Sequence, residues 1–557
     1  MSTEIMTSQN FEFLRDVAPE LADLSGFAEK YLHEDPASAV AKLRLLAENL
    51  VERIYQTHQL PKPFQAKFVD LLTNDAFTSI VAPVILDKIH LLRKIGNKGV
   101  HGDTVPVGDA VQNLSEAFDL ARWFYLFIVK GDRSELPAFK TISVEYVDTK
   151  GKIKKEKKAA LQKLKVQEEQ MQQLLSELEE QRAAVEVAKK KAEELETLLA
   201  ASQQAANILK FDEETTRRRL IDVMLAEAGW KIAANGASTA EVVQEEEVLY
   251  QPTDSGIGYA DYVLREDNGK ALAVIEAKRS SKSPEIGRKQ AQLYAEGIEK
   301  KEGQRPLIFY TNGHQTWLWD DAQKATPRQV FGFYSKDSLQ YLIQQRQLRK
   351  KLGDQLPQEH ITKRLYQSEA IKRICERFDQ GHRKGLIVQA TGTSKTRVAV
   401  ALSDLLIRAG WVKRVLFLCD RRELRKQAKN TFDEFIGEPT TYVTRHTAKD
   451  RTQRIYFGTY PAMQKIFEKF DVGFFDLIIA DESHRSIYNR YRELFHYFDC
   501  LQVGLTATPV DFIARNTYAL FGCEEKNPTV YYPLERAIEE KHLVPYEVFT
   551  YAPVRYL

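Results

Sequence analysis

Cysteine is scarce in this 557-residue chain, and its four copies, Cys375, Cys419, Cys500 and Cys523, form no CxxC pair. Their scatter argues against a disulfide framework or a cysteine-based zinc site and is typical of a protein in a reducing cytosol. Long hydrophobic runs are also absent: FDLIIA is of strand length, too short to cross a membrane, and the N-terminus has no signal pattern. We therefore expect a soluble cytoplasmic protein without membrane association.

The chain also has no large excess of charge of either sign. It contains 80 Lys and Arg and 78 Asp and Glu, which gives a net charge of +2. Any surface for nucleic acid must then come from local clusters of basic residues. The length predicts three or four domains, since one domain usually takes about 100–200 residues.

Glycine and proline are missing from residues 152–205, which are rich in Glu, Lys, Gln and Leu. One heptad seam of this segment is apolar, but its companion seam is mostly polar, so half of a coiled-coil core would be polar, which disfavours a strong self-standing coiled coil. We predict a long connecting helix or coiled coil over 151–208. Before it, apolar residues at helical spacing predict a helical bundle over 1–150.

After residue 208 helices mix with strands, and beyond about residue 360 strands and helices alternate. Such alternation predicts a parallel, doubly wound sheet. The predicted fold class is therefore multidomain: an α-helical bundle with a long connecting helix, followed by two α/β domains over 209–350 and 351–535. Residues 536–557 would begin a further domain.

The first candidate site lies in YADYVLREDNGKALAVIEAKR. Asp261 starts one expected strand, and Glu276 and Lys278 end the next, two residues apart and so on one face. A hairpin would bring Asp261 beside them. Two carboxylates at one point favour a cation between them, and oxygen ligands suit Mg²⁺, which would serve phosphodiester hydrolysis. The alternative is a surface hairpin with an ordinary salt bridge, but both carboxylates lie in otherwise apolar strands, where unpaired charge is unexpected.

The flanking helices carry further polar residues. Gln290 and Tyr294, four apart, share one helix face, and Glu214 lies on the preceding helix. Together with the strand residues this set resembles the PD-(D/E)xK nuclease fold, and the Q-x-x-x-Y spacing resembles the subgroup found in RecB-type and type I restriction nucleases. The resemblance implies catalytic roles for all six residues, with Asp261 and Glu276 as metal ligands.

The second candidate site is a series of motifs at strand ends, where open α/β sheets bind ligands. RLYQSEAIKRI precedes the first strand, ATGTSKT follows it, and DLIIADESHRS and VGLTATP end two later strands. The candidate nucleotide-binding residues are Gln367, Thr391, Gly392, Thr393, Ser394, Lys395, Thr396, Asp481 and His484. Each motif alone could be a strand end or helix cap, but all four in this order are hard to attribute to chance.

The roles follow from charge and geometry. Backbone N–H groups and the helix N-terminus after residue 391 would hold phosphates, and Lys395 would neutralise their charge. Thr396 and Asp481 would bind Mg²⁺, and Glu482 would position the attacking water. The T-A-T of Thr506–Thr508 would couple hydrolysis to movement on DNA. ATP and Mg²⁺ are the expected cofactors.

These motifs resemble a superfamily 2 DEAD-type motor in its DESH variant, and a nuclease before such a motor resembles the R (HsdR) subunit of type I restriction enzymes. FLCDRRELRKQA and FGTY resemble further motifs of that family, and the likeness covers roughly 211–557. It implies a nuclease domain over 209–350 and a first RecA-like domain over 351–535. It also implies ATP-driven translocation on double-stranded DNA, Mg²⁺-dependent cleavage, and methyltransferase and specificity subunits as partners. DNA contacts would be mainly to phosphates, through clusters such as DRRELRKQAKN.

Two departures from the family pattern bear on activity. Ser394 stands where the family has glycine, and a side chain there would crowd the backbone's approach to phosphate, so we expect weakened or altered ATP binding. The chain also stops before a second RecA-like domain, so we expect this chain alone to show negligible DNA-stimulated ATPase. Two other functions remain open: a standalone helicase-nuclease of DNA repair or phage defence, and a non-catalytic DNA-binding scaffold.

Overall fold

The computed structural model describes residues 6–62, 66, 68–101, 104–142, 192–209, 213–233, 237–278, 285–313, 315–448, 450–481, 491–507, 517–524 and 526–545. The chain divides into two compact units, residues 1–216 and 217–557. Within the described ranges no helix is long and apolar enough to cross a membrane.

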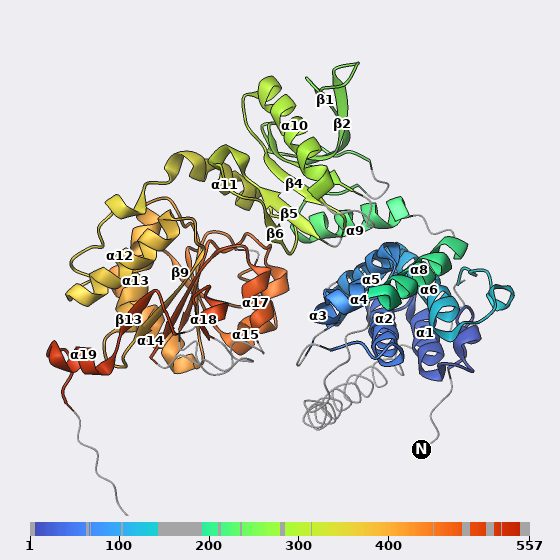
Figure 1. Ribbon diagram of the computed structural model, residues 1–557, viewed down its shortest axis with the longest axis horizontal. Coiled ribbons are helices and arrows are strands. Elements are labelled where there is room, and N and C mark those ends of the chain that lie inside the picture. Colours follow the sequence, from blue (N-terminus) through green and yellow to red (C-terminus); the bar gives the residue numbers. More distant parts are fainter. Residues whose placement is uncertain are drawn as a thin grey trace, which may run out of the picture. The chain divides into compact units, whose positions relative to one another are not determined.

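The first unit is helical, as predicted, and is drawn from blue to green in Figure 1. Its helices are α1 (Pro19–Tyr31), α2 (Pro36–Thr57), α3 (Phe68–Leu72), α4 (Asp75–Thr78), α5 (Pro83–His101), α6 (Val107–Phe124) and α8 (Ala192–Leu209). Asp35 caps α2 by accepting from Ser38 N, and Pro36 fills the first helical position, where no N–H partner is needed.

The predicted connecting helix lies outside the described residues up to residue 191. From there on, α8 packs against the bundle. Ser202 Oγ accepts from Ala82 N at 2.7 Å, and its carbonyl accepts from Trp123 Nε1 at 3.1 Å. Both hydrogen bonds are buried, so this end of the segment belongs to the core of the first unit.

The second unit begins with a mixed six-stranded sheet in the order β1-β2-β3-β4-β5-β6. The strands are β1 (Val242–Leu249), β2 (Ile257–Arg265), β3 (Ala271–Ala277), β4 (Leu307–Thr311), β5 (Thr316–Trp319) and β6 (Arg328–Val330). Only the β3–β4 pair is parallel; the other neighbours are antiparallel. Helices α9 (Glu213–Glu227, which crosses the boundary between the units), α10 (Glu285–Glu302) and α11 (Lys336–Leu348) accompany this sheet.

A seven-stranded sheet follows, in the order β13-β7-β12-β11-β8-β10-β9, with every pair parallel. This confirms the predicted parallel α/β domain. The strands are β7 (Lys384–Gln389), β8 (Val415–Cys419), β9 (Thr440–Tyr442), β10 (Ile455–Thr459), β11 (Leu477–Asp481), β12 (Leu501–Thr506) and β13 (Val530–Tyr532). The helices are α12 (Leu365–Asp379), α13 (Lys395–Arg408), α14 (Arg422–Phe435), α15 (Tyr460–Gln464), α17 (Arg492–Tyr497), α18 (Thr517–Leu520) and α19 (Leu534–Glu539).

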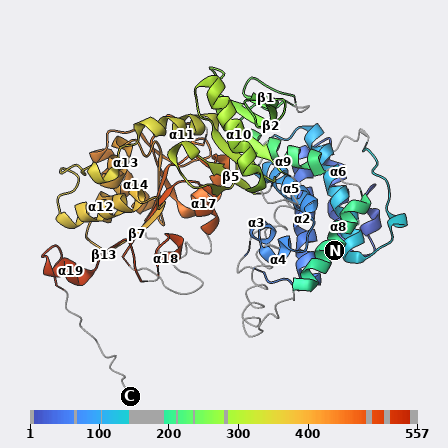
Figure 2. The same cartoon turned by 45° about the horizontal axis from the view of Figure 1, so that its top comes forward.

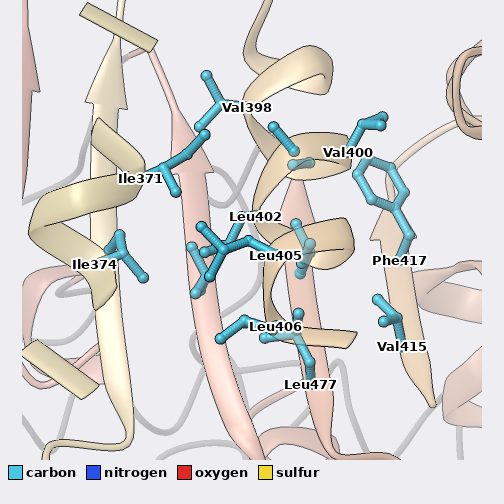
Figure 3. Packing of buried hydrophobic residues seen from close by; sticks show 14 of the residues in the cluster. Ile371, Ile374, Val398, Val400, Leu402, Leu405, Leu406, Val415, Phe417 and Leu477 are labelled. Atoms are coloured by element: carbon cyan, nitrogen blue, oxygen red, sulfur yellow. The ribbon is translucent and has the colours of Figure 1, made fainter. Parts of the chain in front are cut away.

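Both faces of the parallel sheet are covered, because successive strand residues point to opposite sides. Val415 and Phe417 pack with α12, α13 and α14 in the cluster drawn in Figure 3. The intervening Leu416 and Leu418 pack with α15, α17 and α18 on the other face. Figure 2 shows α12, α13 and α14 together, with α17 and α18 apart from them. Strands buried on both sides explain why the sequence shows continuous apolar runs here.

Candidate active sites

Two neighbouring strands bring Asp261, Glu276 and Lys278 together. β2 and β3 are antiparallel with Tyr262 opposite Ile275, so the same register places Asp261 across from Glu276. The backbone N–H of Ala277 donates to Asp261 Oδ2 at 2.6 Å. Lys278, directly after β3, donates from Nζ to Glu276 Oε1 at 2.6 Å. The hairpin therefore gathers two carboxylates and an ammonium group within hydrogen-bond reach of one strand end.

Helix α10 adds an amide and a phenol to this set. Lys278 Nζ also donates to Gln290 Oε1 at 2.6 Å, and Gln290 Nε2 donates to Tyr294 OH at 2.6 Å. Burial raises the pKa of the Tyr294 phenol, against a lowering by its hydrogen bond with Gln290. The phenol thus stays protonated at neutral pH, and the four side chains from Glu276 to Tyr294 form one continuous hydrogen-bonded chain.

Gly287 sets how closely α10 approaches the strand, which the sequence analysis did not anticipate. A Cβ at this position would lie 3.1 Å from Lys278 Cγ and 3.2 Å from Glu276 Cγ, tighter than ordinary contact. The strand is fixed from the other side by Lys278 N, which donates to the carbonyl of Thr311 at 2.8 Å at the end of β4. A glycine in the first turn of a helix after an E-x-K strand is the signal that could have indicated this packing.

The donor set fits a divalent cation of the magnesium type. In the described part of the chain no group of three or more His, Cys, Asp or Glu side chains could hold a metal ion. Mg²⁺, however, is usually held by one or two protein carboxylates, with water and substrate phosphates completing its shell. Asp261 and the 3%-exposed Glu276 supply such a pair. Glu214 lies in the first turn of α9, and its side chain is outside the described residues.

The ATGTSKT stretch forms a compact loop between β7 and α13. Its centre is the carbonyl of the fully buried Thr393, which accepts from Tyr366 OH at 2.9 Å and from Gln389 Nε2 at 2.7 Å. Thr391, Gly392 and Ser394 remain exposed, so the outer backbone of the loop faces solvent while its inner turn is pinned. Tyr366 thereby has a structural contact that sequence reasoning had not assigned to it.

Position 394 has an unusual backbone. Ser394 precedes the first residue of α13 with φ +62° and ψ +50°, the left-handed region, and its side chain makes no capping hydrogen bond. Gly392 also has a positive φ, of +86°. A non-glycine residue in this region costs roughly 1–2 kcal/mol. The preference for glycine at 394 therefore has a conformational cause as well as the steric one expected from the sequence.

Lys395 opens α13, and its Nζ donates to the carbonyl of Gln389 at 3.4 Å, across the loop. Thr396 follows it, half-buried. A helix N-terminus with a lysine and a hydroxyl in its first turn fits the phosphates and Mg²⁺ of a nucleotide, because the backbone N–H groups and the lysine are both positive there.

The carboxyl ends of the central strands lie next to one another. β12 pairs with β7, with Thr506 opposite Val388, and with β11, where Leu505 is opposite Asp481. Thr506 and Asp481 are therefore brought to the strand edge that carries the loop. The carbonyl of Asp481 accepts from Tyr460 OH at 2.9 Å. Tyr460 of the FGTY motif therefore lies beside this strand edge. Glu482, His484 and Thr508 lie outside the described residues.

The basic stretch DRRELRKQAKN leads from β8 into α14, where Arg421, Arg422 and Lys426 are exposed. Arg425 stacks over the Tyr442 ring at 4.4 Å. A shallow hollow of about 380 Å³ on the outer face of this helix contains no residue of either candidate site; it is lined by Glu423, Lys426, Gln427, Asn430, Thr431 and Glu434. Its mixed charge does not single out one ligand.

Comparisons with known proteins match the two regions of the chain that contain these sites. Residues 139–327 match the family model "Type I restriction enzyme R protein N terminus", and residues 360–511 match "Type III restriction enzyme, res subunit". The chain is 25% identical to the type I restriction enzyme EcoKI endonuclease subunit of Escherichia coli K12, over 97% of this chain and 55% of that subunit. It is 34% identical to the EcoAI endonuclease subunit of Escherichia coli, over 52% of this chain and 37% of that subunit.

The chain thus spans about half or less of the length of these relatives. A solved fragment described as an HsdR subunit from Vibrio vulnificus YJ016 is 27% identical, over 59% of this chain and 60% of the fragment, with a TM-score of 0.27. These sequence matches run through both candidate sites. The chain is thus similar to the endonuclease subunits of type I restriction enzymes, and its residues 139–327 to the N terminus of type I restriction enzyme R proteins.

Proposed function

We propose that the protein is the motor and nuclease subunit of a type I restriction-modification complex. It would use ATP to move along double-stranded DNA and Mg²⁺ to cleave DNA that lacks the protective modification. The observation that carries this proposal is the presence, in one unit of the chain, of the hydrogen-bonded Asp261–Glu276–Lys278–Gln290–Tyr294 set and a phosphate-type loop before α13.

At the nuclease site, Asp261 and Glu276 would hold Mg²⁺. When bound, the ion supplies charge neutralisation at the phosphodiester and a more acidic water molecule. Lys278 would orient the attacking water and stabilise the developing negative charge. Gln290 contributes by position: its amide oxygen fixes the ammonium group of Lys278, and Tyr294 in turn fixes Gln290.

At the nucleotide site, the exposed backbone of Thr391, Gly392 and Ser394 would surround the phosphates, and Lys395 would exchange its contact with the Gln389 carbonyl for phosphate oxygens. Thr396 and Asp481 would hold the nucleotide's Mg²⁺, Glu482 would position the attacking water, and His484 would contact the nucleotide, on the family pattern. Methyltransferase and specificity subunits would supply recognition of the DNA sequence.

The proposal is tested with the full-length subunit assembled with its methyltransferase and specificity partners. We expect Asp261→Asn and Lys278→Ala each to lower ATP-dependent DNA cleavage by about 10²-fold or more, while DNA-stimulated ATPase stays near the level of the unmodified complex. Asp267→Asn and Lys289→Ala make the same chemical changes at exposed positions nearby and should leave both activities unchanged.

Two other results would overturn it. A non-catalytic scaffold would retain full function of the assembly in both site variants. A standalone helicase-nuclease would cleave DNA without copurifying partners and without regard to methylation of the DNA. Loss of ATPase in Lys395→Ala with intact folding separates the motor site from the nuclease site.

A further inference from the structure

The residues that follow β13 pack over the candidate phosphate loop. We call residues 533–543, which contain α19, the cap segment. It starts where Tyr532 accepts a hydrogen bond from Ala390 N at 2.9 Å through its carbonyl. It ends at Leu543, whose Cδ2 lies only 3.1 Å from where a Cβ on Gly392 would be. The cap segment thus reaches the exposed, glycine-containing turn of the loop.

The cap segment and its anchor Tyr532 also cover the ring of Tyr366, the neighbour of the candidate nucleotide-binding residue Gln367. The Tyr532 ring stacks on Tyr366 with 4.2 Å between centroids and 15° between planes. The His542 ring meets Tyr366 edge-on at 5.1 Å. Leu543 packs against the same group. Tyr366 is therefore only 4% exposed and has no open face on which a nucleobase could stack.

In this closed arrangement, a buried polar atom beside Tyr366 lacks a hydrogen-bond partner in the described part of the chain, which indicates a second arrangement in which a ligand supplies the partner. Gln367 is 2% exposed, and its Oε1 has no hydrogen-bond partner among the described residues. A buried amide oxygen without a partner is unfavourable. An amino group on a ligand would satisfy it, and the amide of Gln367 has the donor and acceptor pair that a base edge requires.

Few buried contacts hold α19 in the cap segment. Ala537 is the one buried residue of α19, and the ion pairs of Arg536 with Glu540 and Glu369 involve exposed side chains, which contribute little. Tyr532 OH donates to Glu540 Oε2 at 2.8 Å. The left-handed Lys541, with φ +59°, ends the helix, and His542 N donates to the Ala537 carbonyl there.

We propose that the cap segment is a displaceable plug that competes with the nucleobase for Tyr366 and the loop. Nucleotide binding would release residues 533–543 and so change the direction of the chain that follows them. This proposal rests on the proposed function, because it requires a nucleotide at the ATGTSKT loop. It makes nucleotide occupancy a signal to the next part of the polypeptide.

The test is an equilibrium titration of the full-length subunit with a fluorescent N-methylanthraniloyl ATP. Truncating Leu543 weakens the plug and enlarges the population that can bind, so we expect Leu543→Ala to bind about three- to tenfold more tightly. Val544→Ala removes a neighbouring apolar side chain that is 83% exposed and should leave the affinity unchanged. Unchanged or weaker binding in Leu543→Ala would overturn the plug.

A second measurement needs no variant of the plug. Amide hydrogen exchange of residues 533–543 in the unmodified subunit should become faster when ATP is added, and slower exchange or no change would contradict displacement. Lys395→Ala separates the two proposals. If the unmodified subunit binds the probe and Lys395→Ala does not, the nucleotide site stands whatever the plug variants show. If the unmodified subunit does not bind the probe, the proposed function itself fails.

Discussion

Ser394 combines an exposed side chain with a left-handed backbone at the entry to α13. The loop keeps its turn because Thr393, one residue earlier, is held by Tyr366 and Gln389. The surrounding contacts thus impose a conformation that serine does not favour. The strain lies at the point where the backbone must meet phosphate, as is common for strained residues at functional sites.

We predict that Ser394→Gly binds nucleotide more tightly. Glycine removes the side chain that would crowd the approach of the loop backbone to phosphate. The gain should be about 1 kcal/mol, or about fivefold in affinity, measured by titration with a fluorescent ATP analogue. Ser394→Ala is the matched control, since it removes the hydroxyl but keeps the Cβ. Equal affinities of all three proteins would contradict the prediction.

Residue identities near the loop were accessible from the sequence, whereas their contacts were not. ATGTSKT located the turn between β7 and α13, and Ser394 stood out as a departure. The hydrogen bond from Tyr366 to the Thr393 carbonyl joins residues 27 positions apart, and the packing of Gly287 against Lys278 depends on the angle of α10. Neither leaves a periodic signal in the sequence, because each depends on how two elements dock.

At the scale of elements, the parallel sheet was predictable because each strand is a continuous apolar run ending in a polar motif. The strand order was not. β13 pairs with β7, although 140 residues lie between Gln389 and Val530 in the sequence. No local sequence pattern predicts this pairing. The cap segment depends on it, so sequence reasoning placed residues 536–557 in a further domain and had no basis for a contact with the loop.

Asp476 lies immediately before β11, where the backbone N–H groups of Lys413 and Arg414 donate to its Oδ2 at 2.9 and 2.8 Å. Burial raises its pKa to about 6, even though these hydrogen bonds and the nearby cations act to lower it. A raised pKa means that the folded protein holds this proton more tightly than the unfolded chain. The contribution of Asp476 to stability is therefore greatest below pH 4 and is lost as the pH rises through about 6.

We predict that Asp476→Asn is stabilised relative to the unmodified protein at pH 8 and that this advantage shrinks toward pH 5. Asparagine resembles the protonated carboxyl and can still accept both N–H groups. A tenfold change in proton affinity corresponds to about 1.4 kcal/mol; because the side chain keeps some solvent contact, we expect about 1–2 kcal/mol. Urea unfolding midpoints at pH 5, 6, 7 and 8 measure it.

Asp433 gives a control of opposite sign. Burial would raise its pKa, but hydrogen bonds from Lys429 and Thr440 lower it overall. Asp433→Asn should therefore lose stability relative to the unmodified protein at neutral pH, and the loss should disappear in acid. If the stabilities of the two variants changed with pH in the same direction, the effect of Asp476→Asn could not be assigned to the titration of the Asp476 carboxyl.

At the scale of the whole second unit, two carboxylates join the six-stranded and seven-stranded sheets. Asp499, just before β12, accepts from Arg328 Nε of β6 at 2.7 and 2.9 Å to its two oxygens, from Arg383 Nη2 at 2.8 Å, and from Tyr334 OH. Arg328 and Asp499 are 171 positions apart in the sequence. Aspartate is common in the turn before a strand, so the sequence around Asp499 did not indicate Arg328 as its partner.

Asp337, in the first turn of α11, forms the second connection. It pairs with Lys413 at 2.8 Å, with Arg451 at 3.2 Å and with Arg414. Burial would raise the pKa of Asp337, but Lys413 and Arg414 lower it to about 2. Asp499, Arg383, Lys413 and Arg414 all lie at the amino ends of parallel strands whose carboxyl ends carry the nucleotide motifs. The two candidate sites therefore belong to one continuous unit.

We predict that Asp499→Ala lowers the stability of this unit by about 3 kcal/mol, because it leaves the half-buried Arg328 without its counter-charge. Asp499→Asn keeps acceptor capacity without the charge and should lose less. Asp267→Ala, at a carboxylate whose side chain is 81% exposed, is the control and should change stability by less than about 1 kcal/mol.

Urea unfolding followed by tryptophan fluorescence measures the loss of stability in Asp499→Ala. In Asp499→Ala at low urea, the six-stranded sheet should become susceptible to protease before the seven-stranded sheet. If the two sheets still unfold together, with the midpoint of the unmodified protein, the Asp499 cluster does not hold them.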